Sequence, residues 1–228
     1  MPEAIVLLSG GLDSSTVLAM AKERGFDVVA LTFDYGQKHK RELNSARRVA
    51  NHYKVNEHIV IPLNLRGHLK SSLTRESMAI PLRESVSEIG SEIPDTYVPS
   101  RNIIFLSIGA SIAESRGATA LFIASNAVDF SGYPDCTPEF IKAFQKTLDV
   151  GTKAGKEGRG VKVEAPILNT SKAGIVKEAV RLGVPLELTW SCYRGGAKAC
   201  GRCDSCLLRL EGFREAGLKD PLEYEVRT

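Results

Sequence analysis

A glycine-rich turn near the start of the sequence has the residue types that bind phosphate. Residues 9–15 read SGGLDSS, after the apolar run 4–8 and before a helical pattern. Adjacent glycines let a ligand approach the backbone, and the unpaired N–H groups that begin a helix attract anions. Asp13 adds carboxylate oxygens of the kind that Mg²⁺ prefers. The turn is therefore predicted to bind phosphate, against the alternative of a plain strand-to-helix turn with a serine cap.

The turn matches neither of two common phosphate loops. It lacks the Lys-Ser or Lys-Thr of a Walker A loop and the G-x-G-x-x-G of a dinucleotide fold. Its S-G-G-x-D-S pattern resembles the PP-loop ATP pyrophosphatases, which bind ATP and usually cleave it between the α- and β-phosphates. The resemblance implies that ATP, with Mg²⁺, contacts the turn, the helix after it and a carboxylate after the second strand. The expected ATP-binding residues are Leu8, Ser9, Gly10, Gly11, Leu12, Asp13, Ser14, Ser15, Thr16, Val17, Leu18 and Asp34.

Four cysteines near the end of the sequence have the spacing of a metal site. Cys192, Cys200, Cys203 and Cys206 form the pattern C-x7-C-x2-C-x2-C. Four thiolates match tetrahedral Zn²⁺, and a closed site of this kind is typically structural, because catalytic zinc keeps an open position. An iron–sulfur cluster is the alternative, since C-x2-C-x2-C also occurs in ferredoxin-type sites. The fifth cysteine, Cys136, is interpreted as a buried residue, a substrate contact or a nucleophile.

Short apolar runs alternate with helical patterns through most of the chain. This alternation predicts an α/β fold, a doubly wound, Rossmann-like parallel sheet of the adenine nucleotide alpha hydrolase type. Residues 65–95 are polar and weakly periodic, which is typical of a functional loop or lid. The chain is expected to divide into a nucleotide-binding domain, 1–188, and a C-terminal zinc-binding extension, 189–228. Strands are expected at 4–8, 28–33, 57–62, 121–124 and 161–167, and helices at 14–24, 38–53, 102–115, 138–150 and 171–182.

The composition narrows the possible functions. The 228 residues carry a net charge of +3 and are 43% hydrophobic, which is ordinary for a globular protein. No run of clustered basic residues suggests direct binding to nucleic acid. The sequence has neither a secretory signal pattern nor an apolar stretch of about 20 residues. We therefore expect a cytoplasmic protein that contacts no membrane.

Motifs along nearly the whole chain resemble the 7-cyano-7-deazaguanine synthase family of PP-loop enzymes. The phosphate turn is shared with many PP-loop enzymes, whereas SGYPDC at 131–136 and LTWSCY at 188–193 are more specific. Ser100 and Thr137 stand where many members carry Gly and Arg, and both substitutions bear on the substrate contacts. The other matching segments are FDYGQ at 33–37, VPSRN at 98–102 and CGRCDSC at 200–206.

The resemblance implies a ligase that converts a carboxylate into a nitrile. Its substrates are 7-carboxy-7-deazaguanine, ammonia and ATP, and its product is 7-cyano-7-deazaguanine (preQ0), a precursor of queuosine or archaeosine. The carboxylate and then the amide are adenylated. Family members typically carry zinc and often form homodimers. The resemblance implies catalytic roles for Asp13, Ser14 and Arg101 and substrate-binding roles for Ser131, Tyr133 and Asp135; weaker candidates for phosphate contacts are His39 and Lys172.

Three alternatives share the phosphate turn. One is a tRNA-modifying PP-loop enzyme, such as a sulfur transferase with an iron–sulfur cluster. Another is an amide-forming ligase like NAD synthetase, which lacks the later motifs. The third is a nucleotide-sensing protein that binds ATP and releases no AMP.

Overall fold

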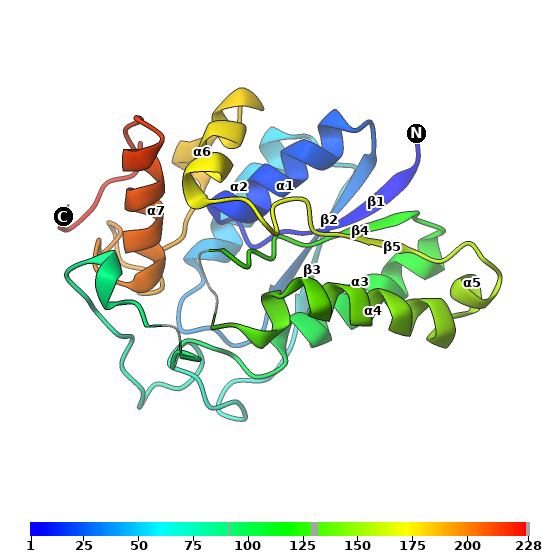
Figure 1. Ribbon diagram of the computed structural model, residues 1–228, viewed down its shortest axis with the longest axis horizontal. Coiled ribbons are helices and arrows are strands. Elements are labelled where there is room, and N and C mark those ends of the chain that lie inside the picture. Colours follow the sequence, from blue (N-terminus) through cyan, green and yellow to red (C-terminus); the bar gives the residue numbers. More distant parts are fainter. Residues whose placement is uncertain (91, 129–131, 227–228) are drawn as a thin grey trace.

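One parallel β-sheet forms the centre of the protein (Figure 1). The computed structural model describes residues 1–90, 92–128 and 132–226. Five strands lie in the order β3-β2-β1-β4-β5, and each neighbouring pair is parallel. The order reverses between β1 and β4, which confirms the doubly wound sheet. The strands are β1 (Glu3–Leu7), β2 (Asp27–Asp34), β3 (Glu57–Pro62), β4 (Ala120–Phe122) and β5 (Lys162–Glu164).

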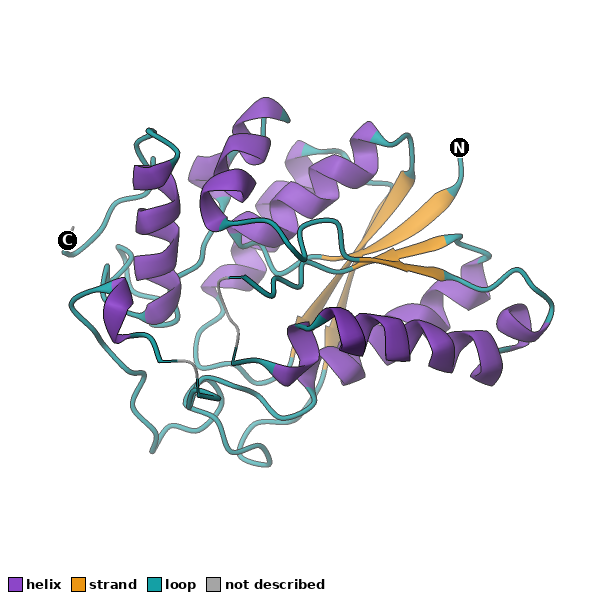
Figure 2. Ribbon diagram, in the orientation of Figure 1, coloured by secondary structure: helices purple, strands orange, loops and turns teal. Residues whose placement is uncertain are grey.

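Helices cover both faces of this sheet (Figure 2). One face carries α1 (Leu12–Glu23), α2 (Arg41–His52) and α6 (Lys172–Arg181), and the other carries α3 (Arg101–Arg116) and α4 (Pro138–Gly151). The remaining helices are α5 (Lys153–Lys156), α7 (Asp204–Glu215) and three single 3-10 turns, η1 (Val86–Glu88), η2 (Pro134–Cys136) and η3 (Leu186–Leu188).

Each expected strand and helix is present, with changes at the ends. The second helix begins at Arg41, three residues later than expected, and α5 was not predicted. The predicted strand 161–167 is wrong in length, because β5 ends at Glu164. Pro166 follows two residues later and has no N–H to donate to a ladder. None of the helices in the described part of the chain combines the length and apolar character needed to cross a bilayer.

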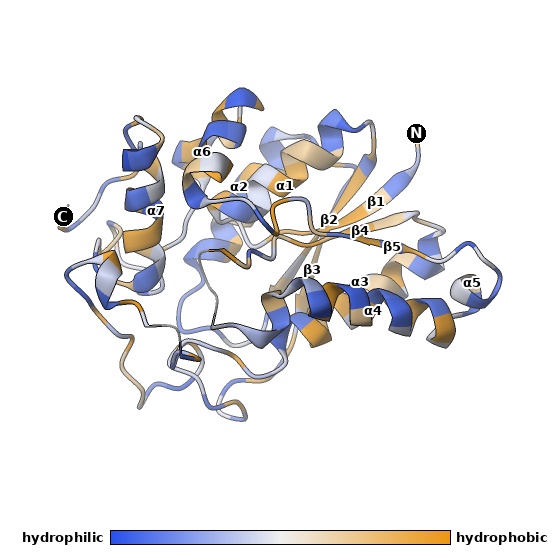
Figure 3. Ribbon diagram, in the orientation of Figure 1, coloured by the Kyte–Doolittle hydropathy of each residue, from blue (hydrophilic) through white to orange (hydrophobic). Residues whose placement is uncertain are grey.

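The central strands are buried on both faces, as a sheet covered by two helical layers requires. Along β1, Ala4 and Val6 pack towards α1 and α6, whereas Ile5 and Leu7 pack towards α3. Figure 3 shows the same division, with hydrophobic strands between helices of mixed hydropathy. The apolar core therefore fixes the sheet, and the polar residues that follow the strands are left at its carboxyl edge.

The last part of the chain joins this layer system through α7, which packs beside α6. The irregular segment 63–100, expected at 65–95 as a loop, passes next to α7, and its described residues form one short helical turn, η1. Arg83 in this segment contacts Asp204 of α7, with Nε 2.7 Å from Oδ1. The main-chain N–H of Arg83 also donates to the carbonyl of Arg202 at 2.8 Å. Two segments far apart in sequence thus form one wall.

Gly10 sets how closely α2 approaches the turn after β1. It has a φ of +83°, and a Cβ at this position would lie 2.3 Å from the nitrogen of Ala46 and 2.6 Å from the carbonyl oxygen of Glu42. Those atoms are backbone and cannot rotate away. Glycine is therefore required both for the left-handed conformation and for the contact with the helix.

Gly10→Ala should destabilise the fold by more than the cost of a left-handed alanine, because the added methyl group would also clash with α2. Gly25→Ala is the matched control, because Gly25 has a φ of +81° and no atom lies within 4 Å of the place that a Cβ would occupy there. A left-handed alanine costs about 1–2 kcal/mol. We expect Gly25→Ala to lose about that much in urea unfolding and Gly10→Ala to lose about 2 kcal/mol more. Equal losses would show that α2 does not press on the turn.

Candidate functional site

A cavity of about 250 Å³ opens where the strand order reverses. Ligands in open α/β sheets bind at this point, outside the carboxyl ends of the strands. The residues that follow β1, β2 and β4 line the cavity, and so do the start of α3 and residues of the C-terminal segment. The cavity is therefore the position that the fold offers for substrate chemistry.

The phosphate turn forms one wall of this cavity. The Oγ atoms of Ser9 and Ser14 lie 3.0 Å apart, and the main-chain N–H of Gly11 donates to Ser9 Oγ at 3.3 Å. Ser15 makes the first helical bond, from its N–H to the carbonyl of Gly11, so the N–H groups just before it have no partner in the helix. These donors suit an anion. Of the twelve residues expected to contact ATP, six line the cavity: Leu8, Ser9, Gly11, Leu12, Asp13 and Ser14.

The other six expected ATP contacts do not line the cavity. Gly10 lies under the turn against α2, and the side chain of Ser15 donates to the carbonyl of Gly11 at 2.7 Å. Asp34 pairs with Lys40, with Oδ2 and Nζ 3.0 Å apart. The remaining three continue into the buried part of α1 and are Thr16, Val17 and Leu18.

Lys172 from the start of α6 reaches the same wall. Its ammonium nitrogen lies 3.0 and 2.8 Å from the two carboxylate oxygens of Asp13. The stem of Lys172 is enclosed by α7, because a Cβ on Gly212 would lie 2.3 Å from its Cγ. Asp13, predicted as a magnesium ligand, thus has a buried cation beside it, and the pair presents both signs of charge to the cavity.

A second part of the cavity lining is aromatic and cationic. Arg101 lies with its guanidinium carbon 6.0 Å from the centre of the Tyr35 ring, and both line the cavity together with Tyr133. The hydroxyl groups of Tyr133 and Thr96 lie 2.8 Å apart. A planar ring system fits between such side chains, and a guanidinium pairs with carboxylate or phosphate.

Asp135 is buried behind this wall and does not line the cavity. Its Oδ2 accepts from the main-chain N–H of Asn102 at 3.0 Å, so the carboxylate stabilises the first turn of α3. Asn102 in turn donates to the carbonyl of Asp135 at 3.0 Å. The role of Asp135 in reading the substrate stays a prediction, as does that of Ser131, which lies outside the described residues.

Two further candidates from the sequence occupy different places. Cys136 lines the cavity, and burial raises the pKa of its thiol, which weakens it as a nucleophile. His39 does not line the cavity and packs against Gly195. Burial and the nearby Arg41 lower the pKa of His39.

Two charged residues in the cavity were missed by the sequence analysis. Glu42 lies in the first turn of α2, and burial raises its pKa to about 7, although Arg101 and Gln37 oppose the rise. Arg209 of α7 is 2% exposed and contacts Asp220 through two nitrogens, at 2.7 and 3.0 Å. Burial opposes the charge on Asp220, but Arg209 holds the pKa of that carboxyl below its usual value.

No local motif marks Glu42, which lies in a charged helix start. For Arg209 a signal existed, because the arginine interrupts the apolar run CLLRL at 206–210. Buried arginines in such runs are normally paired, and their partners are then often part of a site.

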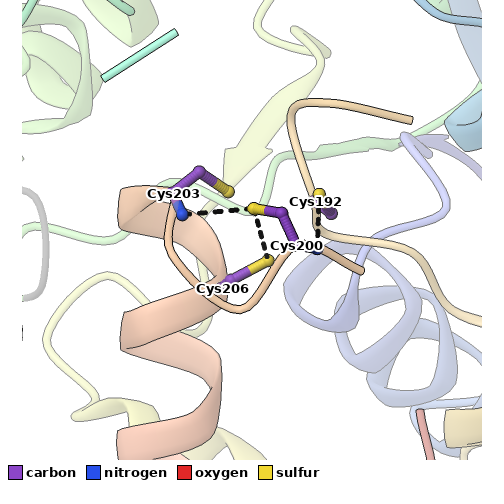
Figure 4. Close-up of side chains that lie close together, drawn as sticks. All are labelled: Cys192, Cys200, Cys203 and Cys206. Carbon is purple, nitrogen blue, oxygen red and sulfur yellow. Dashed lines mark hydrogen bonds between the residues drawn. The ribbon is translucent and has the colours of Figure 1, made fainter. Parts of the chain in front are cut away.

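The four cysteines of the C-terminal segment meet as the spacing predicts (Figure 4). All are buried, and their sulfurs lie within 4.8 Å of one another. The sulfurs of Cys200 and Cys206 are 3.9 Å apart, close to the roughly 3.8 Å that a tetrahedron with bonds of about 2.3 Å requires. The N–H groups of Cys200 and Cys203 donate to neighbouring sulfurs at 3.3 Å, which favours thiolates. The residues therefore fit a single metal ion.

The cysteine cluster is connected to the phosphate turn through Trp190. Its main-chain N–H donates to the carbonyl of Gly10 at 2.8 Å, and its indole N–H donates to the carbonyl of Cys192 at 2.9 Å. The guanidinium of Arg41 lies 4.0 Å from the centre of the indole ring and also contacts the carbonyl of Gly196. A change at the cluster therefore reaches the turn through one residue.

Comparison with known proteins agrees with this geometry. Residues 3–217 match the family described as Queuosine biosynthesis protein QueC. The chain belongs to the QueC family. The matched range includes both the phosphate turn and the four cysteines.

Curated relatives of this QueC chain share more than half of its residues. It is 55% identical over 98% of its length to the 7-cyano-7-deazaguanine synthase of Thermoplasma acidophilum, covering 92% of that protein. It is 51% identical to the enzyme of the same name from Acetivibrio thermocellus, with both chains covered completely. A structure of NMN synthetase from Francisella tularensis gives a TM-score of 0.49 at 13% identity, over 96% of this chain and 78% of that one.

Loss of one cysteine should remove the metal and destabilise the C-terminal segment. We expect purified protein to carry one metal ion per chain by elemental analysis, and Cys203→Ser to lose it and melt several degrees lower. Cys136→Ser is the matched control, because Cys136 is also buried and does not belong to the cluster. Metal retained in full by Cys203→Ser would contradict the assignment.

Proposed function

We propose that this QueC chain is a 7-cyano-7-deazaguanine synthase that uses ATP to turn the carboxylate of 7-carboxy-7-deazaguanine into a nitrile. The observation that carries the proposal is the identity of 51–55% with synthases of that name over essentially the whole chain. The cavity supports it independently, since a turn rich in N–H donors faces an aromatic wall with an arginine. Such a site suits a nucleotide and a planar purine-like acid.

The reaction follows from the chemistry of the acid. A carboxylate is a poor electrophile, and its oxygen is a poor leaving group. Transfer of AMP to the oxygen removes both obstacles, and ammonia then forms the amide. A second adenylation, on the amide oxygen, lets the nitrile form as AMP leaves. No protein nucleophile is needed, so catalysis depends on positioning and on stabilising phosphate charge.

The proposed ATP site consists of the phosphate turn, the start of α1 and Asp34. Asp13 and Ser14 would orient the phosphates, and the ammonium of Lys172 beside Asp13 adds positive charge. Arg101 is proposed to contact the carboxylate or the transferred phosphate. Ser131, Tyr133 and Asp135 are proposed to recognise the deazaguanine. Bound Mg²⁺ would shield charge on the phosphates.

We further propose that the cysteine cluster holds one structural zinc ion. The short distances among the four sulfurs support a single ion, because an iron–sulfur cluster distributes its cysteines over several irons. The proposal also includes a homodimer and a cytoplasmic location. It divides the chain into a nucleotide-binding domain, 1–188, and a C-terminal extension, 189–228. These points rest on the family resemblance and on the sequence.

The identity of the bound metal distinguishes the proposed synthase from a sulfur transferase with an iron–sulfur cluster. We expect protein purified without oxygen to be colourless and to contain one zinc per chain. Cobalt substitution should then give the absorption bands of a tetrahedral thiolate site. Brown protein with visible absorption and several irons per chain would support the sulfur transferase. The names of the relatives give that alternative no support.

The proposed reaction is tested by mass spectrometry with 7-carboxy-7-deazaguanine, ammonium and Mg-ATP. Wild-type protein should give nitrile, and Ser14→Ala should lower turnover by about 10²-fold or more while its thermal unfolding stays cooperative. Ser111→Ala on the exposed surface of α3 is the control and should keep full activity. No nitrile from metal-loaded wild type would refute the function, and full activity of Ser14→Ala would move the ATP site elsewhere.

A further inference from the structure

The proposed reaction has a requirement that the phosphate turn does not meet. Ammonia is mostly protonated at neutral pH, and ammonium has no lone pair with which to attack the acyl adenylate. A group beside the reacting carbon that binds ammonium and accepts a proton from it would supply the nucleophile at this pH. This group has to be an acid whose ionised form is present near neutral pH.

Two carboxylates occur among the described residues that line the cavity, Asp13 and Glu42. Asp13 lies within 3.0 Å of Lys172 through both of its oxygens. The ammonium of Lys172 thus occupies the place beside Asp13 that a second cation would need. Glu42 forms no ion pair of 4 Å or less within the described ranges, although the side chain of Gln37 and the charge of Arg101 both act on its carboxylate. Its carboxylate therefore has no lysine held against it as Asp13 has.

The position of Glu42 is fixed by the close contact between α2 and the phosphate turn. The carbonyl oxygen of Glu42 is one of the atoms that fill the space where Gly10 lacks a side chain. Its carboxylate projects from the first turn of α2 into the same cavity as Ser9 and Arg101. The acid thus lines the same cavity as the phosphate turn and as the arginine that is proposed to contact the carboxylate.

The residues around Glu42 determine the pH at which its carboxyl group ionises. Asp34 and Tyr35 face it from the end of β2, and Arg101 faces it from α3. Burial raises the pKa of Glu42 to about 7, Asp34 adds to the rise, and Arg101 and Gln37 oppose it. Because the pKa lies near neutrality, both forms are populated there, which is the condition for efficient proton transfer. The other titratable groups lining the cavity are Lys172, Tyr133, Cys136, Tyr193 and Arg209.

We propose that the Glu42 carboxylate binds the ammonium ion and accepts a proton from it, so that neutral ammonia attacks the acyl adenylate. This assignment rests on the proposed synthase function and adds a catalytic residue to it. Ammonium and ionised Glu42 give ammonia and protonated Glu42. The nitrogen then bonds to the acyl carbon as the carbon–oxygen bond to AMP breaks. The amide nitrogen loses one proton to solvent, and Glu42 returns its own proton to solvent before the next turnover.

Replacement of Glu42 by glutamine separates this step from adenylation. With ammonium at pH 7, Glu42→Gln should form amide and nitrile about 10²-fold more slowly or worse. Carboxylate-dependent exchange of pyrophosphate into ATP should stay within about threefold of wild type, because it precedes the attack. Glu42→Asp should recover part of the rate, and Glu215→Gln, at an exposed end of α7, should behave as wild type.

Two further readouts distinguish proton transfer from a structural role. Hydroxylamine is unprotonated at neutral pH and needs no base, so Glu42→Gln should form hydroxamate within about threefold of the wild-type rate. In wild type, the rate per total ammonium should level off above about pH 7, as Glu42 ionises. In Glu42→Gln it should keep rising by about tenfold per pH unit, following free ammonia.

The outcomes separate this inference from the function on which it rests. Wild type that shows no carboxylate-dependent pyrophosphate exchange removes the synthase proposal itself. If wild type makes nitrile and Glu42→Gln loses hydroxamate as much as nitrile, Glu42 is only structural and the inference is wrong. Full nitrile formation by Glu42→Gln with ammonium at pH 7 overturns it as well.

Discussion

The contact between Gly10 and the first turn of α2 determines the geometry of the whole site. Only a residue without a side chain leaves room for the backbone of Glu42 and Ala46 at this point. The contact holds the phosphate turn against α2, whose residue Glu42 lines the cavity. A fixed turn also keeps its N–H donors oriented before any ligand arrives, which lowers the cost of organising charge during the reaction.

The cysteine cluster is connected to the phosphate turn, although no cysteine of the cluster lines the cavity. Trp190 bonds to Gly10 on one side and to Cys192 on the other. The residues around it, Ser191 and Tyr193, complete the cavity wall, and Arg209 braces Ser191 with a contact of 3.3 Å. A metal ion held by the four cysteines would keep this wall of the cavity in place.

Local sequence patterns predicted much of the fold and part of the site. The phosphate turn and the four cysteines are compact motifs, and alternating apolar runs gave the strands and helices. The pair between Asp13 and Lys172 joins residues 159 positions apart, and no local pattern encodes such a contact. The motif around Asp135 likewise does not reveal that a carboxylate oxygen of Asp135 accepts from the start of α3. Glu42 becomes significant only once α2 is placed against Gly10.

The cavity is lined by residues that lie far apart in the sequence. The complete cavity can therefore form only late in the synthesis of the chain. The turn after β1 leaves the ribosome more than 170 residues before Trp190 and Arg209. Until then the sheet can form with an open carboxyl edge. A growing chain consequently lacks part of the pocket lining until the C-terminal segment has been added.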